Sequence, residues 1–141
     1  MIALLLALAA AEPPARIDGL PLSALPAQAL PAEGCAAYLF SGGKTRALVA
    51  MASAAPGTLR LALDGQPSDL ARAGQSGSAG YGFAATTEYR AGDVVATLDL
   101  AVRTRNDITQ GAVIESGTLR IDRAGQDTIV LPVGGLIGCA A

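Results

Sequence analysis

Residues 58–65 read TLRLALDG and carry the clearest structural signal in the chain. Leucine stands at every second position from Leu59 to Leu63, with polar or small residues between. A period of two places alternate side chains on opposite faces of an extended strand. The Asp64-Gly65 pair that follows indicates a tight β-hairpin, because glycine reaches positive φ freely. The stretch therefore predicts a half-buried strand that ends in a hairpin.

The same alternation recurs along the chain, and glycine-containing turns separate the segments. It is clear in three further segments, Val94–Arg103, Thr118–Asp122 and Ile129–Val133. It is weaker in four others, Ala36–Phe40, Arg46–Met51, Tyr81–Tyr89 and Ala112–Glu115. Short strands with turns at near-regular spacing predict an all-β fold, a small antiparallel barrel or sandwich of about seven short strands. Because Pro132 cannot donate a ladder hydrogen bond, its strand should lie at an edge or contain a bulge.

The first eleven residues, Met1–Ala11, form an uncharged apolar run that ends in small residues. This pattern is typical of a signal peptide. The run is shorter than the roughly 20 apolar residues that a membrane span requires. A buried apolar N-terminal segment is the alternative. Export predicts a periplasmic or extracellular protein with no stable membrane insertion.

A proline-rich segment, residues 12–34, follows the predicted signal peptide. Leu-Pro occurs three times within it, at Leu20, Leu25 and Leu30. Each proline removes a backbone N–H and restrains the preceding residue, which blocks a continuous helix. We expect an extended linker or strap ahead of a single β-domain, residues 35–141. A docking peptide is the functional alternative for the same segment.

Two cysteines, Cys35 and Cys139, bracket the β-domain. In an exported protein an even cysteine count indicates a disulfide, and two cysteines allow one pairing only. The bridge would close a loop of about 105 residues, for which the chain-entropy model gives on the order of 4–5 kcal/mol of stability. A metal site would need further soft or imidazole ligands, and the chain has no histidine. We therefore predict a structural disulfide that places the first and last strands side by side.

The composition argues against most catalytic and nucleic-acid-binding functions. The 141 residues include 10 basic and 12 acidic side chains, a net charge of −2 and no histidine. Without histidine, Ser-His and Cys-His nucleophile systems are impossible, and a mildly acidic chain does not favour nucleic acid. The glycine-rich stretch Gly74–Gly80 opens no helix and lacks the lysine of a phosphate loop, so we interpret it as a surface loop. We expect no enzyme activity, no cofactor and no metal.

Two groups of residues remain as candidates for binding or chemistry. Tyr81, Phe83 and Tyr89 would share one face of an extended strand, either in the core or as a platform for a sugar or a protein. We expect Phe83 in the core and Tyr81 partly exposed. Glu88 and Asp99, on adjacent predicted strands, could form the carboxylate pair of a glycan-acting enzyme. The alternative is that both carboxylates merely solvate the polar side of the sheet.

Several motifs together resemble the periplasmic inhibitors of C-type lysozyme, a family of small disulfide-closed antiparallel β-barrels. In chain order they are Cys35, Asp64-Gly65, the loop from Ser76 to Tyr81, Tyr89-Arg90 ahead of Gly92, and Cys139. Two features depart from the family pattern, since Tyr81 lies one residue too far from Ser76 and Arg90 is displaced from the position of a lysine just before the glycine. The resemblance implies that Ser76, Tyr81 and Arg90 form the surface that enters the lysozyme cleft. A mildly acidic chain suits such a basic protein partner.

Taken together, these patterns predict an exported β-domain that acts as a non-enzymatic binding or structural module. Its partner is expected to be a basic protein such as a lysozyme, or a glycan. A C-type lysozyme inhibitor-like protein is the alternative function. A carboxylate-based enzyme that acts on glycans is the third.

Overall fold

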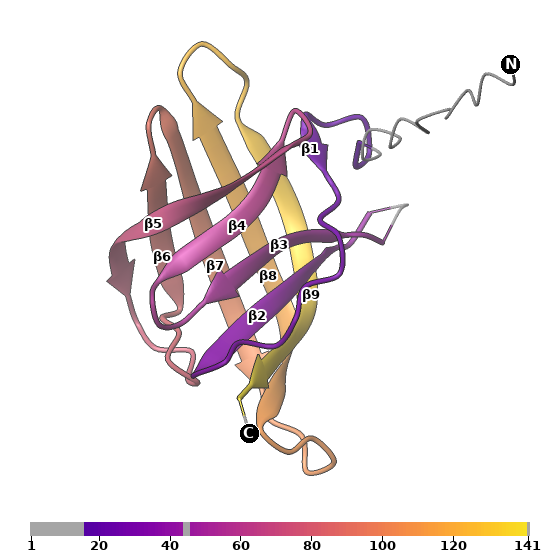
Figure 1. Ribbon diagram of the computed structural model, residues 1–141, viewed down its shortest axis with the longest axis vertical. Coiled ribbons are helices and arrows are strands. Elements are labelled where there is room, and N and C mark those ends of the chain that lie inside the picture. Colours follow the sequence, from indigo (N-terminus) through magenta and orange to yellow (C-terminus); the bar gives the residue numbers. More distant parts are fainter. Residues whose placement is uncertain (1–15, 44–45, 141) are drawn as a thin grey trace, which may run out of the picture.

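The protein is built from β-strands alone within residues 16–43 and 46–140, which are the residues that the computed structural model describes. Figure 1 shows the nine strands, which are β1 (Leu22–Ser23), β2 (Cys35–Ser41), β3 (Leu48–Ser53), β4 (Thr58–Leu63), β5 (Gln66–Ser76), β6 (Thr86–Ala91), β7 (Val94–Arg103), β8 (Gly111–Arg123) and β9 (Ile129–Cys139). The all-β prediction is confirmed, although the strands exceed the expected seven. The predicted signal peptide, Met1–Ala11, lies outside the described residues.

Eight of the strands form a closed barrel. Each strand from β2 to β8 pairs antiparallel with the next along the chain, and β9 returns to pair with β2. We call the β2–β9 ladder the seam, because it closes the sheet. The ninth strand, β1, lies outside the barrel and pairs with the end of β4. Of the two predicted architectures, the barrel is confirmed and the sandwich is wrong.

The barrel interior is filled with side chains rather than hollow. The alternation predicted for residues 58–63 and 94–103 places one side of each strand inward, and eight strands enclose a space just wide enough for side chains. The largest inward residues are fully or almost fully buried, namely Leu39, Leu59, Leu61, Leu70, Tyr89, Leu98, Leu119 and Ile121. The hydrophobic effect of this packed core stabilises the fold.

Strand β5 is the element that the sequence failed to predict. Its only buried residue is Leu70, so it shows no apolar alternation. It forms because β4 and β6 both supply backbone partners along its length. The glycine-rich stretch expected as a loop therefore starts inside β5, which includes Gly74 and Ser76. Strand β6 begins only at Thr86, five residues after the predicted start at Tyr81.

Two other differences concern β8 and β9. The predicted strands 112–115 and 118–122 are one strand, β8, with a register shift between Ile114 and Gly117. Pro132 lies in β9, which has neighbours on both sides and is not an edge strand. The Pro132 carbonyl accepts a hydrogen bond from Gly42, just beyond the last residue of β2. Pro132 has no N–H to return this bond, and the pair lies just past the last residue of β2, where the ladder ends.

The proline-rich segment lies on the barrel from Arg16 onward. Strand β1 pairs with Leu63 and Ala62 of β4, beyond the last residues that pair β4 with β3. The Leu25 N–H donates a hydrogen bond to the Leu48 carbonyl of β3, with 2.8 Å between nitrogen and oxygen. Leu22 is fully buried. The segment thus fills the gap where β3 and β4 diverge, and then runs along the outer side of β2 (Figure 1).

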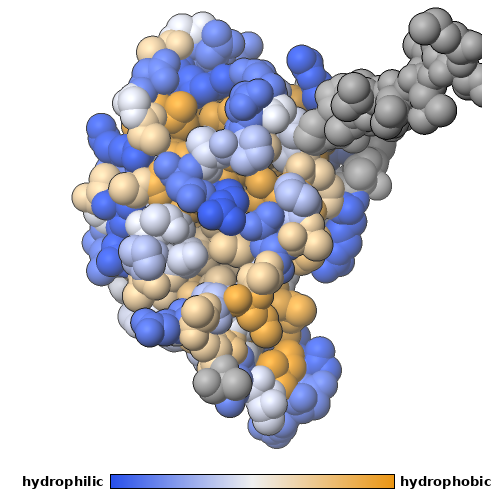
Figure 2. Space-filling view, in the orientation of Figure 1, coloured by the Kyte–Doolittle hydropathy of each residue, from blue (hydrophilic) through white to orange (hydrophobic). Residues whose placement is uncertain are grey.

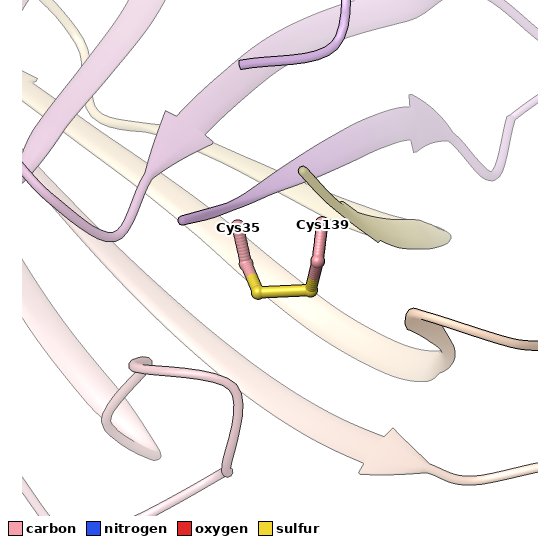
Figure 3. Close-up of a disulfide and its surroundings, with 2 residues drawn as sticks. All are labelled: Cys35 and Cys139. Carbon is pink, nitrogen blue, oxygen red and sulfur yellow. A yellow bond between two sulfur atoms is a disulfide. The ribbon is translucent and has the colours of Figure 1, made fainter. Parts of the chain in front are cut away.

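A disulfide joins the first and last strands of the barrel, as predicted. Cys35 and Cys139 stand directly opposite each other across the seam, and Figure 3 shows both side chains on the same side of the two strands. Their Cα–Cα distance of 4.0 Å is below the usual range of roughly 4.4–6.8 Å. The Ala140 N–H donates to the Gly34 carbonyl, which makes the cysteines a non-hydrogen-bonded pair, the closest kind in an antiparallel ladder.

Candidate functional site

The outer side of the seam presents an apolar surface formed by β2, β9 and residues 16–34, the described part of the proline-rich segment, which we call the strap. Leu39 points inward, so its neighbours Tyr38 and Phe40 point outward. On β9, Leu136 is 51% exposed and pairs with Tyr38 across the seam. Leu30 of the strap is 65% exposed. We call these four residues the seam surface, and Figure 2 shows hydrophobic residues gathered over the lower end of β9.

Three open hollows meet at Leu136. The first, of about 450 Å³, lies between Leu30, Leu136 and Ile108, with Gly138 in its wall. A second hollow of about 360 Å³ lies under the strap, between Leu25, Tyr38, Phe40 and Leu136. A third, of about 370 Å³, lies on the other side of Leu136, around Gly134. The glycines on either side of Leu136 leave this space, because they place no side chain on the outer side of β9.

The first two hollows differ from the third in the charge of their lining. None of their lining residues carries a charge. The Tyr38 hydroxyl donates a hydrogen bond of 2.9 Å to the Ala29 carbonyl of the strap. Partial burial raises the pKa of Tyr38 above its ordinary value. These hollows therefore offer shape and apolar contact, with few polar groups left to pair.

The third hollow has a charged rim. The Arg46 guanidinium lies over the Phe40 ring, 5.5 Å from its centre, in a cation–π contact. Arg105 forms an ion pair of 2.8 Å with Asp107, and Glu115 stands opposite in the same hollow. Charged groups thus border the seam surface beside Phe40 and Leu136, and Arg60 reaches Gln28 of the second hollow through a hydrogen bond of 2.7 Å.

The three residues of the predicted inhibitor surface do not form one cluster. Ser76 ends β5 opposite Thr86, and Tyr81 lies in the loop that follows. Arg90 stands four residues beyond Thr86 along β6, which is about 13 Å at the rise of a strand. Arg90 also forms an ion pair of 3.2 Å with Glu88. Ser76 and Tyr81 therefore lie toward one end of the barrel, and Arg90 toward the other.

The loop that carries Tyr81 has a defined backbone. Three consecutive residues, Gly80, Tyr81 and Gly82, have positive φ angles of 90°, 59° and 85°. Two hydrogen bonds close the turn, from the Ala79 N–H to the Phe83 carbonyl and from the Phe83 N–H to the Gly80 carbonyl. A positive φ is uncommon for tyrosine, so the turn that these hydrogen bonds close imposes this backbone conformation on Tyr81.

The expected burial of the aromatic residues is correct, but the reason given for it is not. Phe83 is 6% and Tyr89 2% exposed, and Tyr81 is half-buried. Only Tyr89 lies in a strand, so a shared strand face cannot explain the burial of Phe83. Burial raises the pKa of Tyr89, against smaller opposing effects of a hydrogen bond with Thr87 and the charge of Arg72.

The two carboxylates considered for glycan chemistry line different hollows. Glu88 lies beside Ser76 and Thr86, whereas Asp99 lies beside Thr118. Glu88 is paired with Arg90, and Asp99 accepts a hydrogen bond from the Thr86 hydroxyl. Among the described residues, no group of three or more cysteine or acidic side chains could hold a metal ion. Neither does any helix in that part of the chain have the length and hydrophobicity to cross a membrane.

Comparison of the chain with family models, with curated proteins and with solved structures found no match. The site is therefore defined by its geometry alone. Sequence reasoning missed Tyr38, Phe40 and Leu136, because it treated residues 36–40 only as a weak strand and ended the last strand at Val133. The available signal was the alternation around Leu39 and the Gly134-Gly135-Leu136 run.

Proposed function

We propose that this protein is a periplasmic or extracellular binding module that has no reaction of its own and binds its partner through the seam surface. The disulfide supports an oxidising compartment, because such bonds persist outside the cytoplasm. The apolar leader predicted from the sequence supports the same location. A packed interior leaves the outer side of the barrel as the place for a ligand.

The exposed apolar cluster at the seam is the observation that carries this proposal. Soluble proteins rarely expose contiguous apolar surface without a function for it. Leu30 and Leu136 are both more than half exposed and line one hollow together. A partner that covered them would remove apolar area from water, which is the main driving force in protein association.

Site-specific photocrosslinking in the intact host compartment tests the proposal. A photoreactive residue at position 136 should give a discrete crosslinked product. The same residue at position 97, on the outer side of β7, should give none, because Thr97 lies outside the seam surface. Equal products from both positions, or none from position 136, would argue against a binding function at the seam.

Inhibition of a C-type lysozyme is the second candidate function, and the Tyr81 loop is the observation that favours it. The loop presents a half-buried tyrosine between two glycines, in a turn that two hydrogen bonds close, and a preformed loop lowers the entropy lost on binding. The purified mature domain should then inhibit a C-type lysozyme, and Tyr81→Ala should abolish inhibition. Arg90→Ala should have little effect, because Arg90 lies away from the loop. A wild-type domain without inhibition excludes this function.

A further inference from the structure

The chain's own strap shows what kind of ligand the seam surface can hold. The strap is an extended segment with three Leu-Pro steps, and the leucine of its second step, Leu25, is buried against the barrel. Its backbone is held from two sides, by the Leu25 N–H to the Leu48 carbonyl and by the Tyr38 hydroxyl to the Ala29 carbonyl. An extended Leu-Pro segment is therefore already docked on this face of the barrel.

The docking surface continues beyond the part that the strap covers. Leu30, the leucine of the third Leu-Pro step, stays 65% exposed and forms one wall of the 450 Å³ hollow. A Cβ added at Gly138 would lie 2.8 Å from the Leu30 side chain, so the strap and β9 are in close contact there. The hollow under the strap and the hollow beside Leu30 share Tyr38 and Leu136. The two hollows therefore adjoin at these residues, and we treat them together as one groove, which the strap covers only in part.

The chemistry of this groove selects the occupant. Its lining carries no charge, so a charged side chain would lose its hydration without gaining a partner. Leucine side chains fit hollows lined by leucine, isoleucine and tyrosine. Proline suits an extended ligand, because it pre-forms the extended backbone and has no N–H that needs an acceptor.

We propose that the groove along Leu136 binds an extended, uncharged segment of a partner protein that contains leucine and proline. The segment would lie against β9 as the strap lies against β2. This inference rests on the proposed binding function and names the class of ligand. It follows from the continuity of the groove with the contact that the strap already makes.

A synthetic peptide with the strap sequence, residues 20–31 with blocked termini, is the probe. It contains all three Leu-Pro steps and no charged residue. Titration into ¹⁵N-labelled mature domain, followed by NMR, should give saturable shifts at Tyr38, Leu136 and Gly138. A peptide with serine in place of its leucines should give none. Absence of saturable binding of the strap peptide would overturn the proposal.

Two matched variants on β9 locate the binding. Leu136→Asp should weaken peptide binding by about tenfold or more, the change expected when a buried leucine contact is lost. Val130→Asp is the control, because Val130 lies on the same side of the same strand and is 60% exposed but lines none of the three hollows. Equal loss in both variants would overturn the site. Unchanged thermal unfolding of each variant shows that the fold is intact.

Other occupants give different results in the same experiments. Concentration-dependent dimers that Leu136→Asp dissociates, without peptide binding, would indicate a second copy of the chain and refute the peptide. Saturable shifts with decanoate but not with the peptide would indicate that the groove binds an acyl chain, and would also refute the peptide proposal. In either case crosslinking from position 136 would still succeed. Failure of the ligand class is thereby distinguished from failure of the binding function.

Discussion

The seam and the β7–β8 ladder are both parts of the same barrel wall, but different forces hold them. Inward positions of the β7–β8 ladder carry large aliphatic pairs such as Leu98 opposite Leu119. At the seam, Ala37 and Leu39 face Ile137 and Gly135, so less side-chain volume meets across the ladder. A disulfide is present at the end of the seam and not in the other ladder. The disulfide therefore supplements the hydrophobic packing at the seam, where less side-chain volume is buried between the two strands.

The outer sides of the two regions differ as well. Outward residues of β7 and β8 are mostly polar, and Thr97 stands opposite Arg120. Arg120 and Asp122 form an ion pair of 3.0 Å on this side. The outer side of the seam instead carries Tyr38, Phe40 and Leu136. The outer surface of the barrel is therefore polar over β7 and β8 and apolar over the seam, and this contrast supports the binding function that we propose for the seam.

Removal of the disulfide is expected to have the largest effect on stability. The double variant Cys35→Ala/Cys139→Ala should lower the free energy of unfolding by roughly 4–5 kcal/mol, the loop-closure value for about 105 residues. Urea denaturation measures the change. Reduced wild-type protein is the control and should match the variant. A loss below about 1 kcal/mol, the value of a single typical hydrogen bond, would mean that the seam holds without its covalent link.

Deletion of the Phe83 ring tests the packing of the core without changing a residue of the seam. Phe83→Ala should cost roughly 3–5 kcal/mol, because removal of a buried aromatic ring leaves a cavity. Tyr81→Ala in the same loop should cost less, since Tyr81 is half-buried. Denaturation midpoints of the two variants give the comparison. A Phe83→Ala midpoint equal to that of the wild type would show that the ring lies outside the core.

The regions that sequence reasoning predicted well are those where local pattern and burial coincide. The β7 bounds, Val94–Arg103, were predicted without error, because every second residue from Val94 faces the interior. The hairpin after β4 was predicted for the same reason and from Asp64-Gly65, where both residues have positive φ. In such strands, the alternation of apolar and polar residues indicates directly which side of the strand is buried.

Prediction failed where tertiary pairing or closure decides the outcome. β5 has one buried residue, so its strand character comes from its neighbours and not from its own sequence. The seam surface was missed for the opposite reason. Tyr38 and Leu136 are apolar, and an apolar residue in a strand is normally assigned to the core. The alternation around Leu39 separates the two sides of the strand, but the folded barrel decides which of them faces inward.

Substitution of two neighbouring glycines tests how closely the seam strands must approach. A Cβ at Gly135 would lie 1.9 Å from the Tyr38 carbonyl oxygen, whereas a Cβ at Gly134 would lie 3.5 Å from the nearest atom, the Ile114 carbonyl oxygen. Gly135→Ala should therefore destabilise the protein by about 1–3 kcal/mol, as overpacking usually does. Gly134→Ala is the matched control and should be tolerated. Equal melting temperatures would show that the seam can widen without cost.

The smallest expected effect lies on the polar side, at Asp122. A hydrogen bond from Thr128, and a second one from Arg120, lower the pKa of the Asp122 carboxyl below its ordinary value. A lowered folded-state pKa adds stability above the unfolded-state pKa, and this stability is lost as the pH falls through the folded-state pKa. The effect on stability should be slight, because exposed ion pairs contribute little. NMR titration of the carboxyl carbon measures the pKa directly.

The Thr128→Val variant separates the two hydrogen bonds, because it removes the first and leaves Arg120 in place. The Asp122 pKa should then rise toward its ordinary value, while Thr118→Val, elsewhere on the outer side of β8, should leave it unchanged. An Asp122 pKa that Thr128→Val does not move would assign the lowering to Arg120 alone. The polar side would then depend on a charge pair within β8, and high salt should weaken it. The groove proposed for the peptide has no charged lining residue, so the same salt titration should leave peptide binding there unaffected.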